Sequence, residues 1–160
     1  TLPIDRKQAL SALAEFIETG LPNFGRYQDA MITNQAYLYH SSLSLCLNVG
    51  LLTPAEVCKA AEKAYQQGDA PLNSVEGFIR QIIGWREYVH GMYWHTMPDA
   101  ASQNALCAMR PLPDFLWSGK TDMHCIAQSV SQTKQEAIAQ HIPRLRVLGH
   151  FSLLACFYPQ

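Results

Sequence analysis

Charged side chains are scarce in this sequence. Only 16% of the 160 residues are Asp, Glu, Lys or Arg, against about 25% in an ordinary globular domain. This scarcity argues against a long disordered tail and indicates surface that is meant to be covered. The formal net charge is −1, which excludes a generally basic clamp for nucleic acid but leaves room for a local basic patch.

Several motifs are missing as well. The five cysteines form no C-x-x-C pair, which is typical of a reduced, cytoplasmic chain rather than a disulfide-stabilised one. The most apolar stretch, residues 147–158, is interrupted by His150 and Ser152 and is too short to span a bilayer. The segment that begins at Trp117 and contains Gly119-Lys-Thr121 lacks the spacing of a phosphate-binding loop, which excludes a nucleoside-triphosphate site.

The sequence predicts helices from end to end, because the alternation of apolar and polar residues that marks a strand is absent. Asp5 caps a first helix that Gly20 closes, and a loop containing Pro22 and Gly25 follows. A second helix is expected from about Gln35 to Gly50. Capping signals open the other expected helices, which begin after Thr53 (ending at Gly68), Asn73 (ending near Trp94), Thr121 (ending near Ser131) and Thr133 (kinked at Pro143).

Residues 98–113, rich in Pro, Ser and Asn, form the longest irregular segment and are expected to be a packed functional loop. We find no internal repeat and no domain boundary. The sequence therefore predicts one all-α domain, a helical bundle over residues 1–160. A chain of this length can bury roughly 70% of its unfolded surface, so it needs no disulfide or metal to hold a core.

Three groups of residues could carry chemistry. The hydroxyls in His40-Ser41-Ser42-Leu43-Ser44 could cradle a phosphate at a helix start, although a plain helix cap is the alternative. Gln81, Trp85 and Arg86 could stack on a base or an isoalloxazine, although a core Trp beside an Arg86–Glu87 pair is the alternative. His141 and Arg144 lie on one helical stripe and suggest a lined cavity, although a partly buried histidine needs no ligand.

The cysteines by themselves predict no metal site. Each is most simply a small buried hydrophobe. His124 beside Cys125 is too little for zinc, which takes four ligands.

Taken together, five blocks resemble the flavin domain of the photolyase/cryptochrome family. They are closest to the bacterial iron–sulfur (6-4) photolyases, and the match runs over residues 23–149. The blocks occur in the order of that family and read Phe24-Gly-Arg-Tyr-Gln-Asp-Ala-Met31, Ser41-Ser-Leu-Ser-x-x-Leu-Asn-x-Gly-Leu-Leu52, Gly84-Trp-Arg-Glu-Tyr88, Trp117-Ser-Gly-Lys-Thr-Asp-Met123 and His141-Ile-Pro-Arg-Leu145.

The resemblance implies a role for each matching position. FAD is implied at the cofactor positions, and a four-iron, four-sulfur cluster is implied at one cysteine. The implied roles are FAD pyrophosphate binding by Tyr27, His40, Ser41, Ser42, Leu43 and Ser44; flavin contact by Gln81, Arg86 and Arg144; contact with the flipped-out DNA lesion by Trp85; electron transfer by Trp117; proton transfer by His141; and cluster ligation by Cys125.

The activity implied by the resemblance is light-driven repair of UV-damaged DNA, with an electron passing from reduced FAD to a flipped-out (6-4) photoproduct. Histidine suits the proton transfer because its pKa lies near neutrality. The family's proton-transfer histidines are only partly matched, since Gln140 and Leu145 stand where members of the family have further histidines.

Several family features are not in these 160 residues. They include the N-terminal domain that holds an antenna chromophore, later helices of the FAD-binding domain and three further cluster cysteines. The chain also begins at Thr1 rather than Met, so we expect a piece of a longer flavoenzyme that is inactive and without FAD by itself and that self-associates through exposed core. Two other readings are a cryptochrome-like flavin photoreceptor and a helical interaction module without chemistry.

Overall fold

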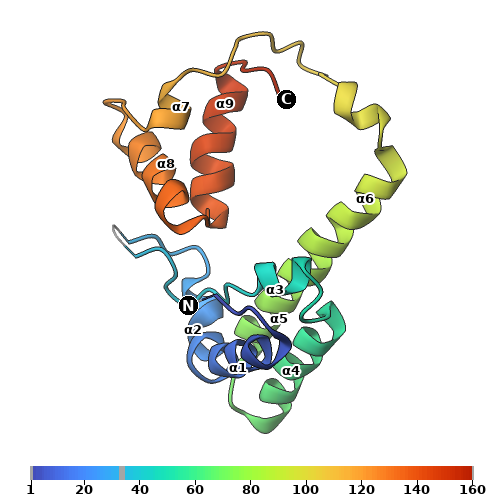
Figure 1. Ribbon diagram of the computed structural model, residues 1–160. Helices are drawn as coiled ribbons and strands as arrows, with labels where there is room; N and C mark the ends of the chain where they lie inside the picture. Colours follow the sequence, from blue (N-terminus) through green and yellow to red (C-terminus); the bar gives the residue numbers. More distant parts are fainter. Residues whose placement is uncertain (1, 33–34, 160) are drawn as a thin grey trace. The chain divides into compact units, whose positions relative to one another are not determined.

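The computed structural model describes residues 2–32 and 35–159. Contacts divide the chain into two compact units, the first comprising Thr1–Ala30 and Tyr37–His95, and the second Met31–Ala36 and Thr96–Gln160. The described residues contain helices and two isolated bridges but no strand, so the predicted all-α class is confirmed (Figure 1). No helix among the described residues is both long and apolar enough to cross a membrane.

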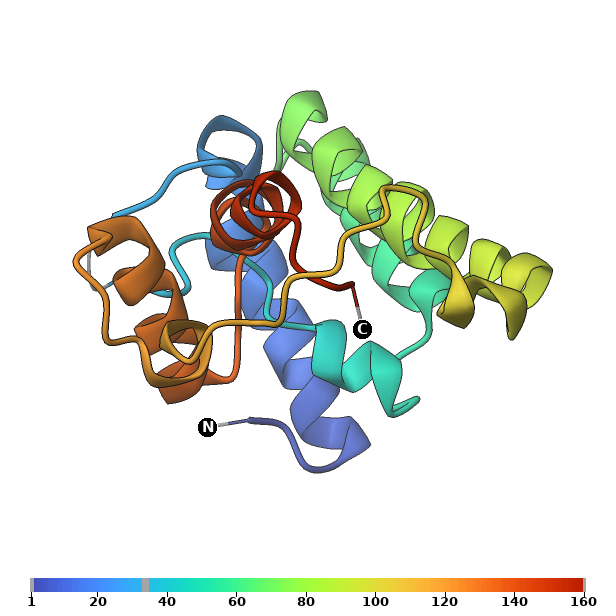
Figure 2. The same cartoon turned by 90° about the horizontal axis from the view of Figure 1, so that it is seen from above.

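Two long helical runs and two shorter helices build the first unit. The second run continues through a wide π-helical segment, and Figure 2 shows it along its length in green to yellow. In chain order the elements are α1 (Arg6–Glu15), η1 (Phe16–Gly20) and α2 (Leu21–Tyr27) in the first run; α3 (Ser44–Asn48); α4 (Pro54–Gln67); and α5 (Leu72–Arg80), η2 (Gln81–Glu87) and α6 (Tyr88–Thr96) in the second run.

Side-chain caps begin two of these helices as predicted. The Asp5 carboxylate accepts a hydrogen bond from the backbone N–H of Gln8 at 2.8 Å, at the start of α1. Thr53 and Glu56 form the expected reciprocal capping box of α4. Gly68 ends α4 with a φ of +83°, a conformation that glycine adopts without steric cost.

The prediction of a loop around Pro22 and Gly25 is wrong, because both residues lie in α2. Pro22 occupies the first turn of α2, where a missing N–H is tolerated. Gly25 lies against α5: a Cβ there would come within 2.7 Å of the backbone of Asn73 and Ser74. The Ser74 hydroxyl joins the two helices, accepting from Gly25 N at 2.9 Å and donating to Pro22 O at 3.3 Å. Close packing therefore explains a glycine that looks locally like a loop signal.

Other expected boundaries are also corrected. No helix begins near Gln35; the next helix after α2 is α3, of only five residues. Pro71, not Asn73, precedes α5. Thr133 lies inside a helix, where its hydroxyl donates back to Ser129 O at 2.8 Å instead of capping. Pro143 falls in the first turn of a helical segment and so begins that segment rather than kinking a longer one.

Three phenylalanines form the centre of the first unit's core. Phe78 lies 4.7 Å from Phe16 and 5.8 Å from Phe24, measured between ring centroids. Aliphatic side chains from α1, α2, α4 and α5 complete the core. The fully buried larger members in this unit are Leu21, Leu43, Leu52, Val57 and Cys46.

The second unit is built from short helices. The run η4–α9 packs against α8, with Ile126 and Val130 of α8 buried. Near the chain end, Arg110 N donates to Cys156 O at 3.1 Å and Tyr158 N donates to Arg110 O at 2.8 Å. The elements are η3 (Asp99–Ser102), α7 (Phe115–Ser118), α8 (His124–Glu136), η4 (Ile142–Gly149) and α9 (His150–Leu154).

Acid should destabilise the first unit through Glu56. The carboxylate pairs with Arg6 and accepts hydrogen bonds from Thr53, which lowers the pKa of Glu56 from 4.5 to about 2. Because the folded-state pKa is depressed, this stabilisation is present above pH 4.5 and is lost as the pH falls through about 2.

We expect the urea midpoint, followed by circular dichroism, to fall over that range, and to fall less steeply in Glu56→Gln. Glu62→Gln on the same helix is the matched control, since Glu62 accepts an exposed hydrogen bond from Gln66 Nε2 at 3.4 Å. Equal acid dependence in both variants would contradict the assignment.

Candidate functional site

A cavity in the first unit brings together two segments that the sequence singled out separately. It lies between the chain at residues 41–47 and the α5–η2 run, and its volume is about 190 Å³. Five of its lining residues are predicted cofactor contacts. The lining consists of Ser41, Leu43, Ser44, Leu47, Phe78, Gln81, Ile82 and Arg86.

The serine-rich segment is a turn rather than a helix interior. Ser41 Oγ accepts from Leu43 N at 3.4 Å, and Ser42 adopts the left-handed region with a φ of +53°. Such a conformation is uncommon for a residue with a side chain and is often found at functional sites. The turn directs the chain so that Ser41 and Ser44, but not Ser42, line the cavity.

Arg86 is held in place from α3. Its Nη1 donates to Asn48 Oδ1 at 2.8 Å and its Nη2 donates to Leu47 O at 3.3 Å. Its Nε is buried, makes no hydrogen bond, and lies 3.7 Å from a carboxylate oxygen of Glu87. A buried N–H without a partner is costly unless a ligand accepts from it. Arg86 therefore offers an anchored cation with one unused donor.

His40 and Tyr27 lie near the same segment but do not line the cavity. Burial lowers the pKa of His40, and the charge of Asp29 opposes that shift only partly. His40 is therefore neutral at pH 7, and its buried Nε2 has no hydrogen-bond partner. Tyr27 stacks on Tyr39 with ring centroids 5.3 Å apart.

Two wide π-helical segments coincide with predicted site residues. The segment η2 carries Gln81, Trp85 and Arg86. The segment η4 begins directly after His141 and carries Arg144. Insertions of this kind occur frequently at functional sites because they re-aim side chains within a helix. Trp85 is half-exposed beside Arg86.

The second unit holds the remaining predicted residues. Trp117 lies in the short helix α7 with 70% of its surface exposed. His141 is half-buried and Arg144 is exposed. Next to His141, the side chain of Gln140 donates to Ala36 O.

Cys125 lies exposed in α8. Among the described residues, no group of three or more His, Cys, Asp or Glu side chains is placed to hold a metal. The residues that the structure describes therefore do not fit an iron–sulfur cluster, which takes four ligands.

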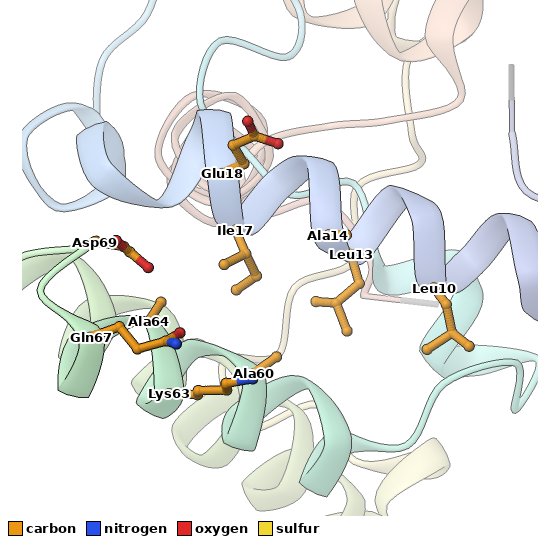
Figure 3. A pocket seen from close by; sticks show the side chains of 10 residues that line it. All are labelled: Leu10, Leu13, Ala14, Ile17, Glu18, Ala60, Lys63, Ala64, Gln67 and Asp69. Atoms are coloured by element: carbon orange, nitrogen blue, oxygen red, sulfur yellow. The ribbon is translucent and has the colours of Figure 1, made fainter.

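A larger cavity in the first unit contains none of the predicted residues. Its volume is about 610 Å³ and it lies between the α1–η1 run and α4. Figure 3 shows Leu13 and Ile17 pointing into it. Its lining combines six Leu, Ile and Ala side chains with Glu18, Lys63, Gln67 and Asp69, whereas the 190 Å³ cavity combines apolar side chains with hydroxyls, an amide and a guanidinium. Because five of the residues that line the smaller cavity are predicted cofactor contacts, we take the smaller cavity as the candidate site.

The sequence analysis missed four residues of this site. Leu47, Phe78 and Ile82 line the cavity, and Asn48 anchors Arg86. The signal for two of them was present, because Phe78, Gln81 and Ile82 follow the i, i+3, i+4 spacing of one helical face. Asn48, like Leu47, stands in the second of the family blocks, but its contact with Arg86 crosses 38 positions of sequence and gave no local signal.

Comparison with known proteins gives two relatives, and no protein-family model matches the chain. A (6-4) photolyase of Agrobacterium fabrum is 51% identical over 157 residues, which is 98% of this chain and 31% of that protein. An uncharacterized protein of Acanthamoeba polyphaga mimivirus is 31% identical over 114 residues, which is 71% of this chain and 87% of that protein. The chain thus spans about a third of the length of the (6-4) photolyase. Half of all positions are shared along nearly the whole chain, and on that evidence the chain belongs to the photolyase family.

Proposed function

We propose that these residues form part of the FAD-binding domain of an enzyme that repairs (6-4) photoproducts in UV-damaged DNA with light. The observation that carries the proposal is the 190 Å³ cavity lined by Ser41, Ser44, Gln81 and Arg86. The 51% identity to a (6-4) photolyase also supports the proposal. When bound, FAD supplies the light-driven electron to the lesion.

The cavity fits one part of FAD rather than all of it. Pockets that enclose a drug-sized ligand measure about 300–1,000 Å³, and this cavity is smaller, at about 190 Å³. Serine hydroxyls are suitable donors to phosphate oxygens, so we assign Ser41 and Ser44 to the pyrophosphate side. We assign Gln81 and Arg86, with the Phe78 ring, to the adjoining flavin part of the cofactor.

Other residues also have proposed roles, and Leu43 among them lines the 190 Å³ cavity. His141 moves a proton at the lesion, and Trp85 contacts the extruded base. Arg144 contacts the flavin ring, while Trp117 carries an electron to it. Tyr27, His40, Ser42 and Leu43 support the pyrophosphate segment. Cys125 would be one ligand of the cluster that the resemblance implies, although the described residues do not supply a full ligand set for it.

A chimera tests the proposal. The matching 157-residue segment of the Agrobacterium fabrum (6-4) photolyase is replaced by the corresponding residues of this chain. We expect the purified chimera to bind FAD and to repair a (6-4) photoproduct under blue light, with the unaltered photolyase as positive control. A chimera that folds and binds FAD but repairs nothing would favour the photoreceptor reading, and one that folds without FAD would overturn the proposal.

The cavity assignment has its own test in that chimera. Ser41→Ala with Ser44→Ala, and separately Arg86→Gln, should each weaken FAD binding about tenfold or more, since hydrogen bonds to charged groups contribute about 1.5–3 kcal/mol. Riboflavin, which lacks the phosphates, should bind the serine variants as it binds the parent. Ser131→Ala, an exposed serine in α8, is the matched control. Unchanged FAD affinity in both cavity variants would contradict the assignment.

A further inference from the structure

Three side chains form a hydrogen-bonded and charged series along one face of the η2–α6 run. Trp94 Nε1 donates to His90 Nε2 at 2.8 Å. His90 Nδ1 lies 3.9 Å from Glu87 Oε2. The spacing of i, i+3 and i+7 places all three on the same helical face, so the series depends on one continuous helix rather than on tertiary contacts.

The geometry specifies the proton positions on His90. Because Nε2 accepts the indole N–H, the proton of the neutral imidazole resides on Nδ1, on the side of the Glu87 carboxylate. The other charged group at this carboxylate is Arg86, whose Nε is 3.7 Å from Glu87 Oε1. Because Nε2 carries no proton in this tautomer, it faces the indole N–H of Trp94 as a base.

Packing does not explain Trp94. Its surface is 73% exposed, and α6 contributes no residue to the described core. Its ring contacts are Tyr93, edge-on at 5.6 Å, and His90. An i, i+4 side-chain pair stabilises a helix by only about 0.2–0.5 kcal/mol. The series is therefore better explained by chemistry at the indole than by stability.

We propose that Trp94 is a one-electron donor whose indole proton passes to His90. The indole loses one electron to a one-electron oxidant, its N–H bond breaks, and a new N–H bond forms at His90 Nε2. The oxidant gains the electron, and the resulting imidazolium faces Glu87. A photoexcited, oxidised flavin is the class of oxidant that we assign, and that identity rests on the proposed function, whereas the proton transfer does not.

Free flavin tests the proton transfer without a bound cofactor. In the 160-residue chain carrying Trp85→Phe and Trp117→Phe, Trp94 is the remaining tryptophan. Illumination with free riboflavin is followed by transient absorption, which separates the indole radical cation from the neutral radical. At pH 8 we expect rapid conversion to the neutral radical. His90→Gln should slow that conversion by at least about tenfold, since a positioned base contributes substantially to proton transfer.

His95→Gln, on the same helix, is the matched control and should leave the rate unchanged. Circular dichroism checks that each variant is folded. Equal deprotonation rates in folded His90→Gln and its parent would overturn the proposal.

The tautomer provides a second, independent test. In the unsubstituted chain at pH 8, nitrogen-15 NMR should show the His90 proton on Nδ1 and a Trp94 indole N–H that shifts in His90→Gln. A proton on Nε2 would overturn the geometry. Neither experiment uses a bound cofactor, so their failure is distinguishable from failure of the FAD-binding chimera.

Discussion

We expect His141→Ala to abolish repair by the chimera while FAD binding is retained. A positioned acid or base contributes about 10²–10⁴-fold to a reaction that moves a proton, so a loss of at least about 100-fold is expected. The (6-4) lesion needs a proton moved together with its hydroxyl, and an imidazole exchanges protons near neutral pH. His141 suits this role in its own unit because it is half-buried and directly precedes the wide segment η4.

Repair is measured as the light-dependent disappearance of the photoproduct from an oligonucleotide, and FAD content is measured by absorbance. His150→Ala, an exposed histidine at the start of α9, is the control and should keep full repair. Unimpaired repair in His141→Ala would count against proton transfer by His141.

Phe78→Ala should destabilise the first unit by about 3–5 kcal/mol, the range for removing a buried aromatic ring. Phe78 is 5% exposed and contacts the rings of Phe16 and Phe24. Its removal also opens the wall of the candidate cavity. Stability and cofactor binding should therefore fall together.

Urea unfolding followed by circular dichroism measures this loss. Leu72→Ala on the same helix is the matched control, because Leu72 is 58% exposed and an exposed substitution changes stability by about 0.5 kcal/mol or less. A difference below about 1 kcal/mol between the two variants would contradict the central position of Phe78 in the core.

Local signals predicted the fold where a helix end is defined by neighbouring residues. Asp5, the Thr53–Glu56 box and Gly68 act through contacts within four residues of themselves, and these predictions are confirmed. Local signals failed where a distant segment determines the conformation. Gly25 lies in a helix because α5 approaches its backbone, and Ser74 holds that approach across 49 positions.

The candidate site shows the same division. Helical spacing placed Gln81 and Arg86 on one run, and the hydroxyl cluster marked the segment that begins at Ser41. Their meeting at one cavity, and the anchoring of Arg86 by Asn48 and Leu47, depend on contacts between α3 and η2. No pattern within either segment contains that information.

By itself, the sequence determined the helical class, the family resemblance and the residue types available for chemistry, because composition, capping and ordered motifs are local properties. The low charged fraction of 16% also indicated surface to be covered. Tertiary structure alone decided which hydroxyls of the 41–44 segment face a cavity and which donor of Arg86 is left unused. The reason is physical: burial and unsatisfied hydrogen bonds arise only when segments distant in sequence pack together.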